Sequence, residues 1–216
     1  MTDVADEVIW TVVVGAGGGM RFGAPKQYEP LGEGRVIDVA VATARRASDG
    51  VVVVVPPSDA ERERAVAGGA TRSGSVRAGL AAVPAEATIV CVHDAARPLA
   101  TVDLFAAVVA SVHDGADAVV PAVAVADTVK VVDADGVVVE TPDRATLVAV
   151  QTPQAFRAAV LRRALATGAD GTDDAALVER IGGRVVTVPG EAWNRKITAP
   201  DDLEWARRWL AGRVAP

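Results

Sequence analysis

Runs of β-branched residues alternate along the chain with alanine-rich amphipathic stretches. Ile9–Val14 and Val51–Val55 have the length and valine content of strands that are buried on both faces of a sheet. Stretches with apolar residues at helical spacing follow them, as in Val36–Arg46 and Val102–His113. This order predicts right-handed crossovers and a three-layer α/β fold with a doubly wound, mostly parallel sheet. The predicted strands are Ile9–Val14, Val51–Val55, Thr88–Val92, Ala118–Val123 and Arg184–Val188, and the predicted helices are Val36–Arg46, Ser58–Val66, Ser75–Val83, Val102–His113, Arg157–Ala166, Thr172–Ile181 and Pro200–Ala211.

Hydroxyl side chains mark two of the predicted helix starts. Ser75 is expected to cap the helix over 75–83, because a serine oxygen can accept from the first free backbone N–H groups. Thr172 is expected to cap the helix over 172–181, with acidic residues in the first turn that favour its N-terminus.

The alternation of strands and helices breaks between about 125 and 150. Thr128–Val132 and Val137–Glu140 predict a β-hairpin that turns at Asp135-Gly136. Since no helix separates the two strands, the hairpin is expected to project as an arm from a single domain that spans 1–216. An isolated two-stranded ribbon is marginal in water, which favours packing of this arm on another surface.

Composition narrows the class of protein. Half of the 216 residues are hydrophobic and only 4% are aromatic, so the core must be built from valine, alanine and leucine. The net charge of −6 argues against a nucleic-acid surface and against attraction to anionic lipid. The single cysteine, Cys91, fits a reducing compartment, and neither a signal peptide nor an apolar run of membrane-spanning length is evident. We therefore expect a cytoplasmic protein without membrane or nucleic-acid partners.

A glycine-rich loop follows the first predicted strand, in the sequence VVVGAGGGMRFGAPKQY over 12–28. It fails the dinucleotide-binding fingerprint, because Met20 stands where a glycine or alanine is needed. It also fails the Walker pattern, because Ala24-Pro25 follows Gly23 in place of Lys and a hydroxyl. What remains is a turn whose backbone N–H groups can approach a nucleotide, followed by two cations, Arg21 and Lys26. Such cations suit nucleotidyl transfer, in which charge develops on the α-phosphate and the leaving pyrophosphate.

A second polar segment, His93-Asp94-Ala95-Ala96-Arg97-Pro98, follows the predicted strand Thr88–Val92. The carboxyl ends of strands are where open α/β sheets bind ligands. A carboxylate at that edge can hold Mg²⁺ or accept a hydroxyl of a substrate. Asp94 is the carboxylate that either role would use, and the family resemblance given below implies that it is the metal ligand.

The loop over 15–28 resembles the nucleotide loop of the 2-C-methyl-D-erythritol 4-phosphate cytidylyltransferases, roughly P-A-A-G-x-G-x-R-[ML] followed by P-K-Q-[FY]. Val14-Gly15 stands where that family usually has Pro-Ala, and Phe22 replaces its Met or Leu. Further matches follow in the same order and extend the resemblance from about Ile9 to Leu210. They are Gly68-Gly69 with Arg72 and Ser75, the His93–Pro98 segment, Asp127-Thr128-Val129-Lys130, Arg144, Gln151-Thr152-Pro153-Gln154, Thr172-Asp173 and Lys196-Ile197-Thr198.

The resemblance implies transfer of a cytidylyl group from CTP to 2-C-methyl-D-erythritol 4-phosphate in non-mevalonate isoprenoid biosynthesis, with Mg²⁺ or another divalent cation. It implies a homodimer in which the arm of one subunit reaches the substrate of the other. The implied catalytic residues are Arg21, Lys26, Arg144 and Lys196. The implied nucleotide-binding residues are Gly15, Ala16, Gly17, Gly18, Gly19, Gly69, Ser75 and Asp94. The implied residues for the polyol phosphate are Asp94, Arg97, Thr128, Arg144, Thr152, Thr172 and Lys196.

Other interpretations stay open at this point. The loop cations could be ordinary surface residues, Ser75 and Thr172 could serve only as caps, and Lys196 could be an exposed lysine. A cytidylyltransferase acting on ribitol 5-phosphate shares the loop chemistry, and a nucleotide-binding protein without catalysis is the alternative from another class.

Overall fold

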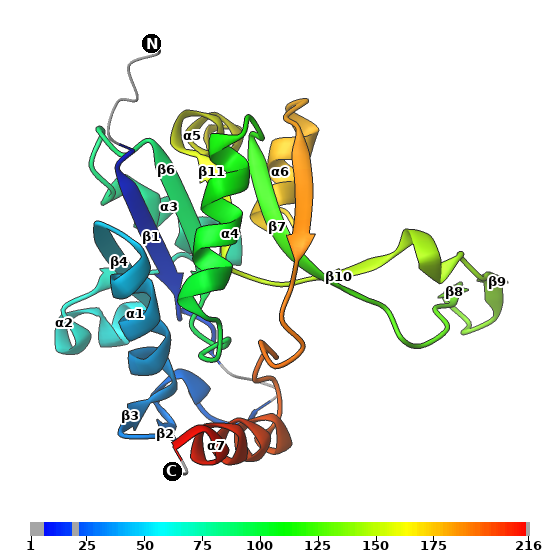
Figure 1. Cartoon of the computed structure of the whole chain (residues 1–216), viewed down its shortest axis with the longest axis horizontal. Coiled ribbons are helices and arrows are strands. Elements are labelled where there is room, and N and C mark those ends of the chain that lie inside the picture. Colours follow the sequence, from blue (N-terminus) through cyan, green and yellow to red (C-terminus); the bar gives the residue numbers. More distant parts are fainter. Residues whose placement is uncertain (1–6, 19–21, 215–216) are drawn as a thin grey trace.

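The computed structural model describes residues 7–18 and 22–214. Its core is one eight-stranded sheet in the order β10-β7-β11-β6-β1-β4-β5, and the eighth strand, β12, also pairs with β7. β10 and β11 are antiparallel to their neighbours, whereas the other pairings are parallel. The predicted doubly wound, mostly parallel sheet is confirmed (Figure 1). The strands of this sheet are β1 (Ile9–Val14), β4 (Gly50–Val55), β5 (Val66–Ala67), β6 (Ile89–Asp94), β7 (Ala118–Ala124), β10 (Val148–Val150), β11 (Gln154–Arg157) and β12 (Val185–Pro189).

Helices cover both faces of the sheet because successive strand residues point to opposite sides. On β1, Val12 belongs to the core that the sheet forms with α3 (Arg72–Ala81), α5 (Ala158–Ala166) and α6 (Asp174–Arg180). Its neighbour Val13 belongs to the core on the opposite face, formed with α1 (Val36–Ala47) and α4 (Val102–His113). Both valines are fully buried, which explains why the strands read as unbroken valine runs rather than as an alternating pattern.

A third, smaller core lies below the sheet in Figure 1, where α7 (Pro200–Val214) packs on the β2–β3 ribbon (Pro30–Leu31 and Gly34–Arg35). Trp209 stacks on both Trp193 and Trp205, with ring centroids 5.7 and 5.6 Å apart. Ile197 is buried in the same core, so the segment that carries Lys196 is anchored at this end of the molecule.

Several predicted boundaries need correction. The helix predicted from Ser75 begins at Arg72, and Thr71 caps it by accepting from the backbone N–H of Gly74 at 3.0 Å. The helix predicted from Thr172 begins at Asp174, with Asp173 as its cap. In the first case an earlier residue, and in the second a later one, supplies the side-chain oxygen that accepts from the free N–H groups. Sequence alone does not separate these candidate caps.

The helix predicted over 58–66 is shorter than expected. A 3₁₀ turn, η2 (Pro57–Asp59), leads into α2 (Ala60–Glu63), and Arg64 then adopts a left-handed conformation with φ of 50°. Val66 consequently belongs to β5, which pairs with β4.

The hairpin arm is confirmed. β8 (Val131–Val132) pairs antiparallel with β9 (Val138–Glu140), and Gly136 adopts φ of 83° in the turn between them. The arm stands away from the body of the molecule in Figure 1. Within the described part of the chain, no helix is both long enough and apolar enough to span a bilayer.

Candidate active site

Two adjoining cavities lie at the carboxyl ends of β1 and β6, and we name them after residues that line only one of them. The glycine-loop cavity has a volume of about 410 Å³, and the Thr152 cavity about 340 Å³. Arg72, Asp94 and Lys196 line both cavities and therefore mark their junction. The glycine-loop cavity is also lined by Val14–Gly18, Lys26, Gln27, Gly69–Thr71, Ser75, Ala95 and Ala96, and the Thr152 cavity by Arg97, Val150–Thr152, Gln154, Thr172 and Asp173.

The glycine loop forms one wall of the first cavity, with Gly15, Ala16, Gly17 and Gly18, the residues expected to bind a nucleotide, in its lining. Gly15 is held in place because its backbone N–H donates to the carbonyl of Val54 at 2.7 Å. A β-carbon on Gly17 or Gly18 would meet no atom within 4 Å, so these two residues face open space. The predicted residues Gly19 and Arg21 lie outside the described residues.

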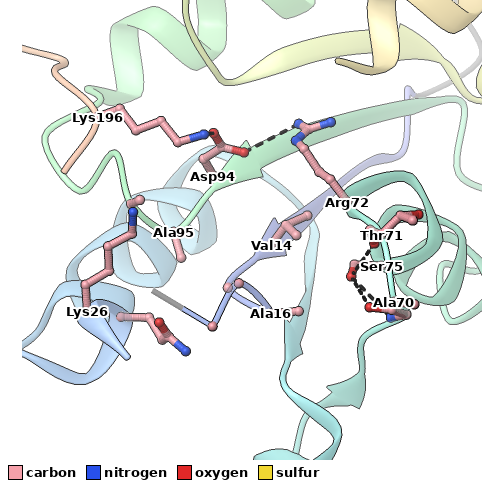
Figure 2. A pocket seen from close by; sticks show the side chains of 16 residues that line it. Val14, Ala16, Lys26, Ala70, Thr71, Arg72, Ser75, Asp94, Ala95 and Lys196 are labelled. Carbon is pink, nitrogen blue, oxygen red and sulfur yellow. Dashed lines mark hydrogen bonds and ion pairs between the residues drawn. The ribbon is translucent and has the colours of Figure 1, made fainter. Parts of the chain in front are cut away.

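Lys26 begins the 3₁₀ turn η1 (Lys26–Tyr28) directly after Pro25 and lines the glycine-loop cavity. In Figure 2 its ammonium lies on the same side of the cavity as Lys196. Proline fixes the backbone immediately before this lysine, which limits the directions its side chain can take.

The opposite wall consists of the loop at Gly69 and the first turn of α3. The Ser75 hydroxyl accepts from the backbone N–H of Gly69 at 3.2 Å and donates to the carbonyl of Thr71 at 3.0 Å. A β-carbon on Gly69 would lie 2.8 Å from the backbone of Gly74, so only glycine permits this approach of loop to helix. Ser75 therefore fixes the loop to the helix instead of capping the helix, and Gly69, Ala70 and Thr71 of this loop line the cavity.

Asp94 ends β6 at the junction, with only 8% of its surface exposed. Its Oδ2 accepts from the ammonium of Lys196 at 2.6 Å, and its Oδ1 lies 3.4 Å from the guanidinium of Arg72 (Figure 2). Burial by itself would raise the pKa of Asp94, but the charges of Lys196 and then Arg72 outweigh it and hold the pKa well below its usual range. The carboxylate is therefore ionised at neutral pH.

His93 anchors the loop instead of acting as a base. Its Nε2 lies 3.1 Å from the carbonyl of Arg97, which can only accept, so Nε2 carries the proton. Its Nδ1 then accepts from the Thr152 hydroxyl at 3.0 Å, and the same hydroxyl accepts from the backbone N–H of Asp94 at 3.0 Å. Burial lowers the pKa of His93 to about 4, so the ring is neutral at pH 7. These hydrogen bonds, through His93 and Thr152, fix the backbone of Asp94.

Arg97, Thr152 and Thr172, which the family resemblance assigns to the polyol phosphate, line the second cavity. The guanidinium of Arg97 donates to the carbonyls of Asn194 at 2.8 Å and Val150 at 3.2 Å. Arg97 therefore supports the segment that carries Lys196 while adding positive charge to the cavity wall.

Two predicted site residues lie on the arm, away from the cavities of their own chain. Thr128 is exposed at the base of the arm, and Arg144 begins the 3₁₀ turn η3 (Arg144–Thr146), where its guanidinium donates to the carbonyl of Ala126 at 2.8 Å. Neither residue lines the two cavities.

Three polar residues at the site had no role in the sequence-based assignment. Arg72 reaches the junction, Gln154 donates to Asp173 at 2.8 Å in the Thr152 cavity, and Asp174 is fully buried beneath Arg72. From sequence, Asp173 and Asp174 are expected to favour the start of a helix, and Asp173 also belongs to a segment that matches the family. No local pattern indicates that Arg72 and Asp174, which are 102 positions apart, form an ion pair.

The described residues contain no cluster of three or more His, Cys, Asp or Glu side chains that could cage a metal ion. Among the described residues that line both cavities, Asp94 is the one carboxylate, and two hydrogen bonds leave part of its acceptor capacity unused. One carboxylate fits Mg²⁺, which usually binds one or two carboxylates together with the phosphates of a substrate.

The arrangement brings Lys26, Arg72, Arg97 and Lys196 around two connected spaces in a protein whose net charge is −6. Such local positive charge suits two anionic ligands that must approach each other.

Known proteins are similar to this chain over most of its length. The model of the family "2-C-methyl-D-erythritol 4-phosphate cytidylyltransferase" matches residues 9–211. The 2-C-methyl-D-erythritol 4-phosphate cytidylyltransferase of Nocardia farcinica is 46% identical over 97% of each chain. The protein of the same name from Rhodococcus opacus is 49% identical over 91% of this chain and 92% of its own.

Solved structures agree as well. A 4-diphosphocytidyl-2C-methyl-D-erythritol synthase from Anaerococcus prevotii superposes with a TM-score of 0.83 at 28% identity, covering 95% of this chain and 99% of its own. A 2-C-methyl-D-erythritol 4-phosphate cytidylyltransferase from Thermus thermophilus gives 0.79 at 33% identity, covering 93% and 98%. On both sequence and fold, the chain belongs to the 2-C-methyl-D-erythritol 4-phosphate cytidylyltransferase family.

Proposed function

We propose that this protein transfers the cytidylyl group of CTP to 2-C-methyl-D-erythritol 4-phosphate and releases pyrophosphate, a step of isoprenoid precursor biosynthesis. The observation that carries the proposal is the pair of adjoining cavities with Asp94, Lys196 and Arg72 at their junction. The glycine-loop cavity takes CTP and the Thr152 cavity takes the polyol phosphate, so that the two reacting phosphates meet between them.

In the proposed reaction an oxygen of the polyol phosphate attacks the α-phosphorus of CTP in line with the bond to pyrophosphate. That bond breaks and pyrophosphate leaves with the electron pair. A phosphate monoester is already ionised at neutral pH, so no general base is needed, in accord with the buried, neutral His93. Lys26 and Arg21 stabilise the charge on the phosphates of CTP, and Lys196 orients the attacking phosphate.

Base selection is assigned to the wall formed by Gly69 and Ser75. Gly69, Ala70 and Thr71 line the cavity, and the Ser75 hydroxyl fixes this loop to α3. Fixed backbone groups discriminate well, because a wrong base leaves them without partners.

Mg²⁺ is proposed as the divalent cation, held by phosphate oxygens of CTP with Asp94 as the protein carboxylate. When bound, it would neutralise part of the triphosphate charge. The buried, unpaired thiol of Cys91 fits a reducing compartment, and we propose the cytoplasm.

The arm supports a homodimer as the working form. The large apolar side chains that stand exposed on the described surface belong to residues 131–150, among them Val138 at 52% and Val139 at 60% exposure. An apolar ribbon that stands away from its own body is suited to clasp a second copy of the chain. Thr128 and Arg144 would then reach the Thr152 cavity of the partner, which explains why neither lines a cavity of its own chain.

Placing a charge on the ribbon is expected to break the dimer. Val139→Asp should weaken self-association at least about tenfold, because an aspartate would be buried without a partner in the apolar contact. Sedimentation velocity across a concentration series measures this shift. Ala42→Asp, which adds the same charge on the exposed face of α1, serves as the control and should leave the dimer intact. A wild-type protein that is monomeric throughout the series would contradict the proposal.

Complementation tests whether the arm completes the partner's site. If each site combines Lys26 of one chain with Arg144 of the other, a dimer of one Arg144→Ala chain and one Lys26→Ala chain has one intact site. Its other site carries both substitutions. Mixing the two inactive variants should restore about a quarter of wild-type turnover. If Arg144 acts within its own chain, mixing restores nothing.

The function itself is tested with a matrix of nucleotides and polyol phosphates, scored by pyrophosphate release. We expect turnover with CTP and 2-C-methyl-D-erythritol 4-phosphate to exceed that with any other pair by at least about a hundredfold in kcat/KM, since a site that pairs polar groups rejects ligands that leave them unpaired. Preference for ribitol 5-phosphate would identify the alternative substrate. CTP binding without turnover on any polyol phosphate would identify a non-catalytic nucleotide-binding protein.

A further inference from the structure

Arg72 joins three elements that meet at the junction. It is the first residue of α3, and its guanidinium reaches Asp174 at the start of α6 and Asp94 at the end of β6. Figure 2 shows Lys196, Asp94 and Arg72 in a row along one side of the glycine-loop cavity. The Arg72 side chain is 25% exposed and lines both cavities.

The two partners hold Arg72 with unequal strength. Its Nη1 donates to Asp174 Oδ2 at 2.6 Å, the short distance of a charge-assisted hydrogen bond, and the Asp174 carboxylate is fully buried. Its Nη2 lies 3.4 Å from Asp94 Oδ1, near the upper limit for a hydrogen bond. Asp94 is in turn held more closely by Lys196, at 2.6 Å. One edge of the guanidinium is therefore anchored, while the other can exchange Asp94 for a better acceptor.

A phosphate oxygen is such an acceptor. The guanidinium is a planar fork that remains protonated at any working pH and matches the geometry of phosphate oxygens. Because Arg72 lines both cavities, that phosphate must lie where the ligands of the two cavities meet. In cytidylyl transfer the group at this position is the α-phosphate, which becomes part of the new diphosphate bridge.

We propose that Arg72 is a further catalytic residue, which donates hydrogen bonds to the α-phosphate of the nucleotide while the polyol phosphate attacks it. Asp174 is the positioning residue that aims the guanidinium. This inference rests on the proposed cytidylyl transfer. It adds Arg72, held in place by the buried Asp174, to Lys26 and Arg21 as a third cation on the phosphates of CTP. Arg72 forms and breaks no covalent bond and transfers no proton.

Kinetics of Arg72→Gln and Arg72→Ala test the role. Arg72→Gln should lower kcat about thirtyfold, less than the loss of a sole charge donor because Lys196 and Lys26 remain, with KM for CTP changed less than about threefold. Added guanidinium ion should raise kcat of Arg72→Ala at least about fivefold, because it can occupy the vacated space between Asp174 and the phosphate. A side chain needed only for folding would show no such rescue.

The matched control is Arg77→Gln on the same helix. Arg77 lines neither cavity and donates to the carbonyls of Leu165, Gly168 and Ala169, so its loss should lower the melting temperature and leave kcat within about twofold. Asp174→Asn should lower kcat and add little to the loss in Arg72→Gln, because both act through one guanidinium.

Failure of the proposed function and failure of the Arg72 role give different results. A wild-type protein that releases no pyrophosphate refutes the proposed function and the Arg72 role together. An active wild type refutes the Arg72 role alone if kcat of folded Arg72→Gln stays within threefold of it, or if Arg72→Ala loses activity that guanidinium does not restore.

Discussion

Replacing Lys26 by methionine is expected to lower kcat for cytidylyl transfer at least about a hundredfold, the scale on which loss of one fixed charge donor acts. The ammonium lines the cavity assigned to CTP and follows a proline that limits its positions. Methionine keeps most of the volume of the side chain and removes its charge. Pyrophosphate release at saturating concentrations of both substrates measures the effect, and the melting temperature establishes that the variant is folded.

Arg46→Ala is the matched control for Lys26→Met. It removes one positive charge from an exposed position in the last turn of α1, outside both cavities. A general effect of net charge on binding of anions would lower kcat/KM in both variants alike. Near-normal kcat in Lys26→Met would overturn the assignment of Lys26 to the reacting phosphates.

Replacing Lys196 by methionine is expected to affect both catalysis and stability. Loss of the ammonium should lower kcat/KM for the polyol phosphate about a hundredfold, since hydrogen bonds between charged groups contribute about 1.5–3 kcal/mol. It also leaves the buried Asp94 with Arg72 alone, which should cost about 2 kcal/mol of unfolding free energy at pH 7. Steady-state kinetics and urea denaturation measure the two effects.

The pH dependence of stability separates the ion pair from simple loss of packing. The native pKa of Asp94 lies below that of the unfolded chain, so its ionised form adds stability above about pH 4, and this contribution is lost as the pH falls towards the native pKa. In Lys196→Met the pKa is lowered less, because the larger opposing charge is gone. Protonation of the unfolded chain is the same in both proteins, so the stability difference should stay constant above about pH 4 and narrow as the pH falls below it towards the native pKa of the wild-type carboxylate, whereas a packing defect would keep it constant throughout. Lys196→Arg, which keeps the charge, should follow the wild-type curve.

Strands buried on both faces were the best predicted elements of the fold. Ile9–Val14 has the predicted bounds, because it is a continuous apolar run rich in β-branched residues. The helix Val102–His113 also has the predicted bounds. β10 and β11 were not predicted. Each is short, and β11 contains Gln154 and Arg157, so its pattern resembles a loop until its pairing with β6 and β7 is seen.

The site could be predicted where its residues are close in sequence. Asp94 and Arg97 follow one strand, and Lys26 follows the glycine loop, so sheet topology alone places them at one edge. Lys196 was assigned through the family resemblance, and the structure places its ammonium on Asp94. Contacts that depend on how helices pack, such as Arg72 on Asp174, leave no signal in a local pattern.

The helix caps show a different limit of prediction from sequence. Thr71 and Ser75 are both hydroxyl residues near one helix start, and Asp173 lies next to Thr172. Propensity ranks such neighbours almost equally. The choice is decided by where the chain enters the helix, which depends on the approach of Gly69 to Gly74 and other contacts distant from the cap itself.

The stacked rings of Trp193, Trp205 and Trp209 also give the protein an optical property. They are three of its four tryptophans, and the fourth, Trp10, belongs to β1. Intrinsic emission is consequently weighted towards the end of the molecule that holds the segment of Lys196, and unfolding curves recorded by fluorescence follow that end more than the sheet.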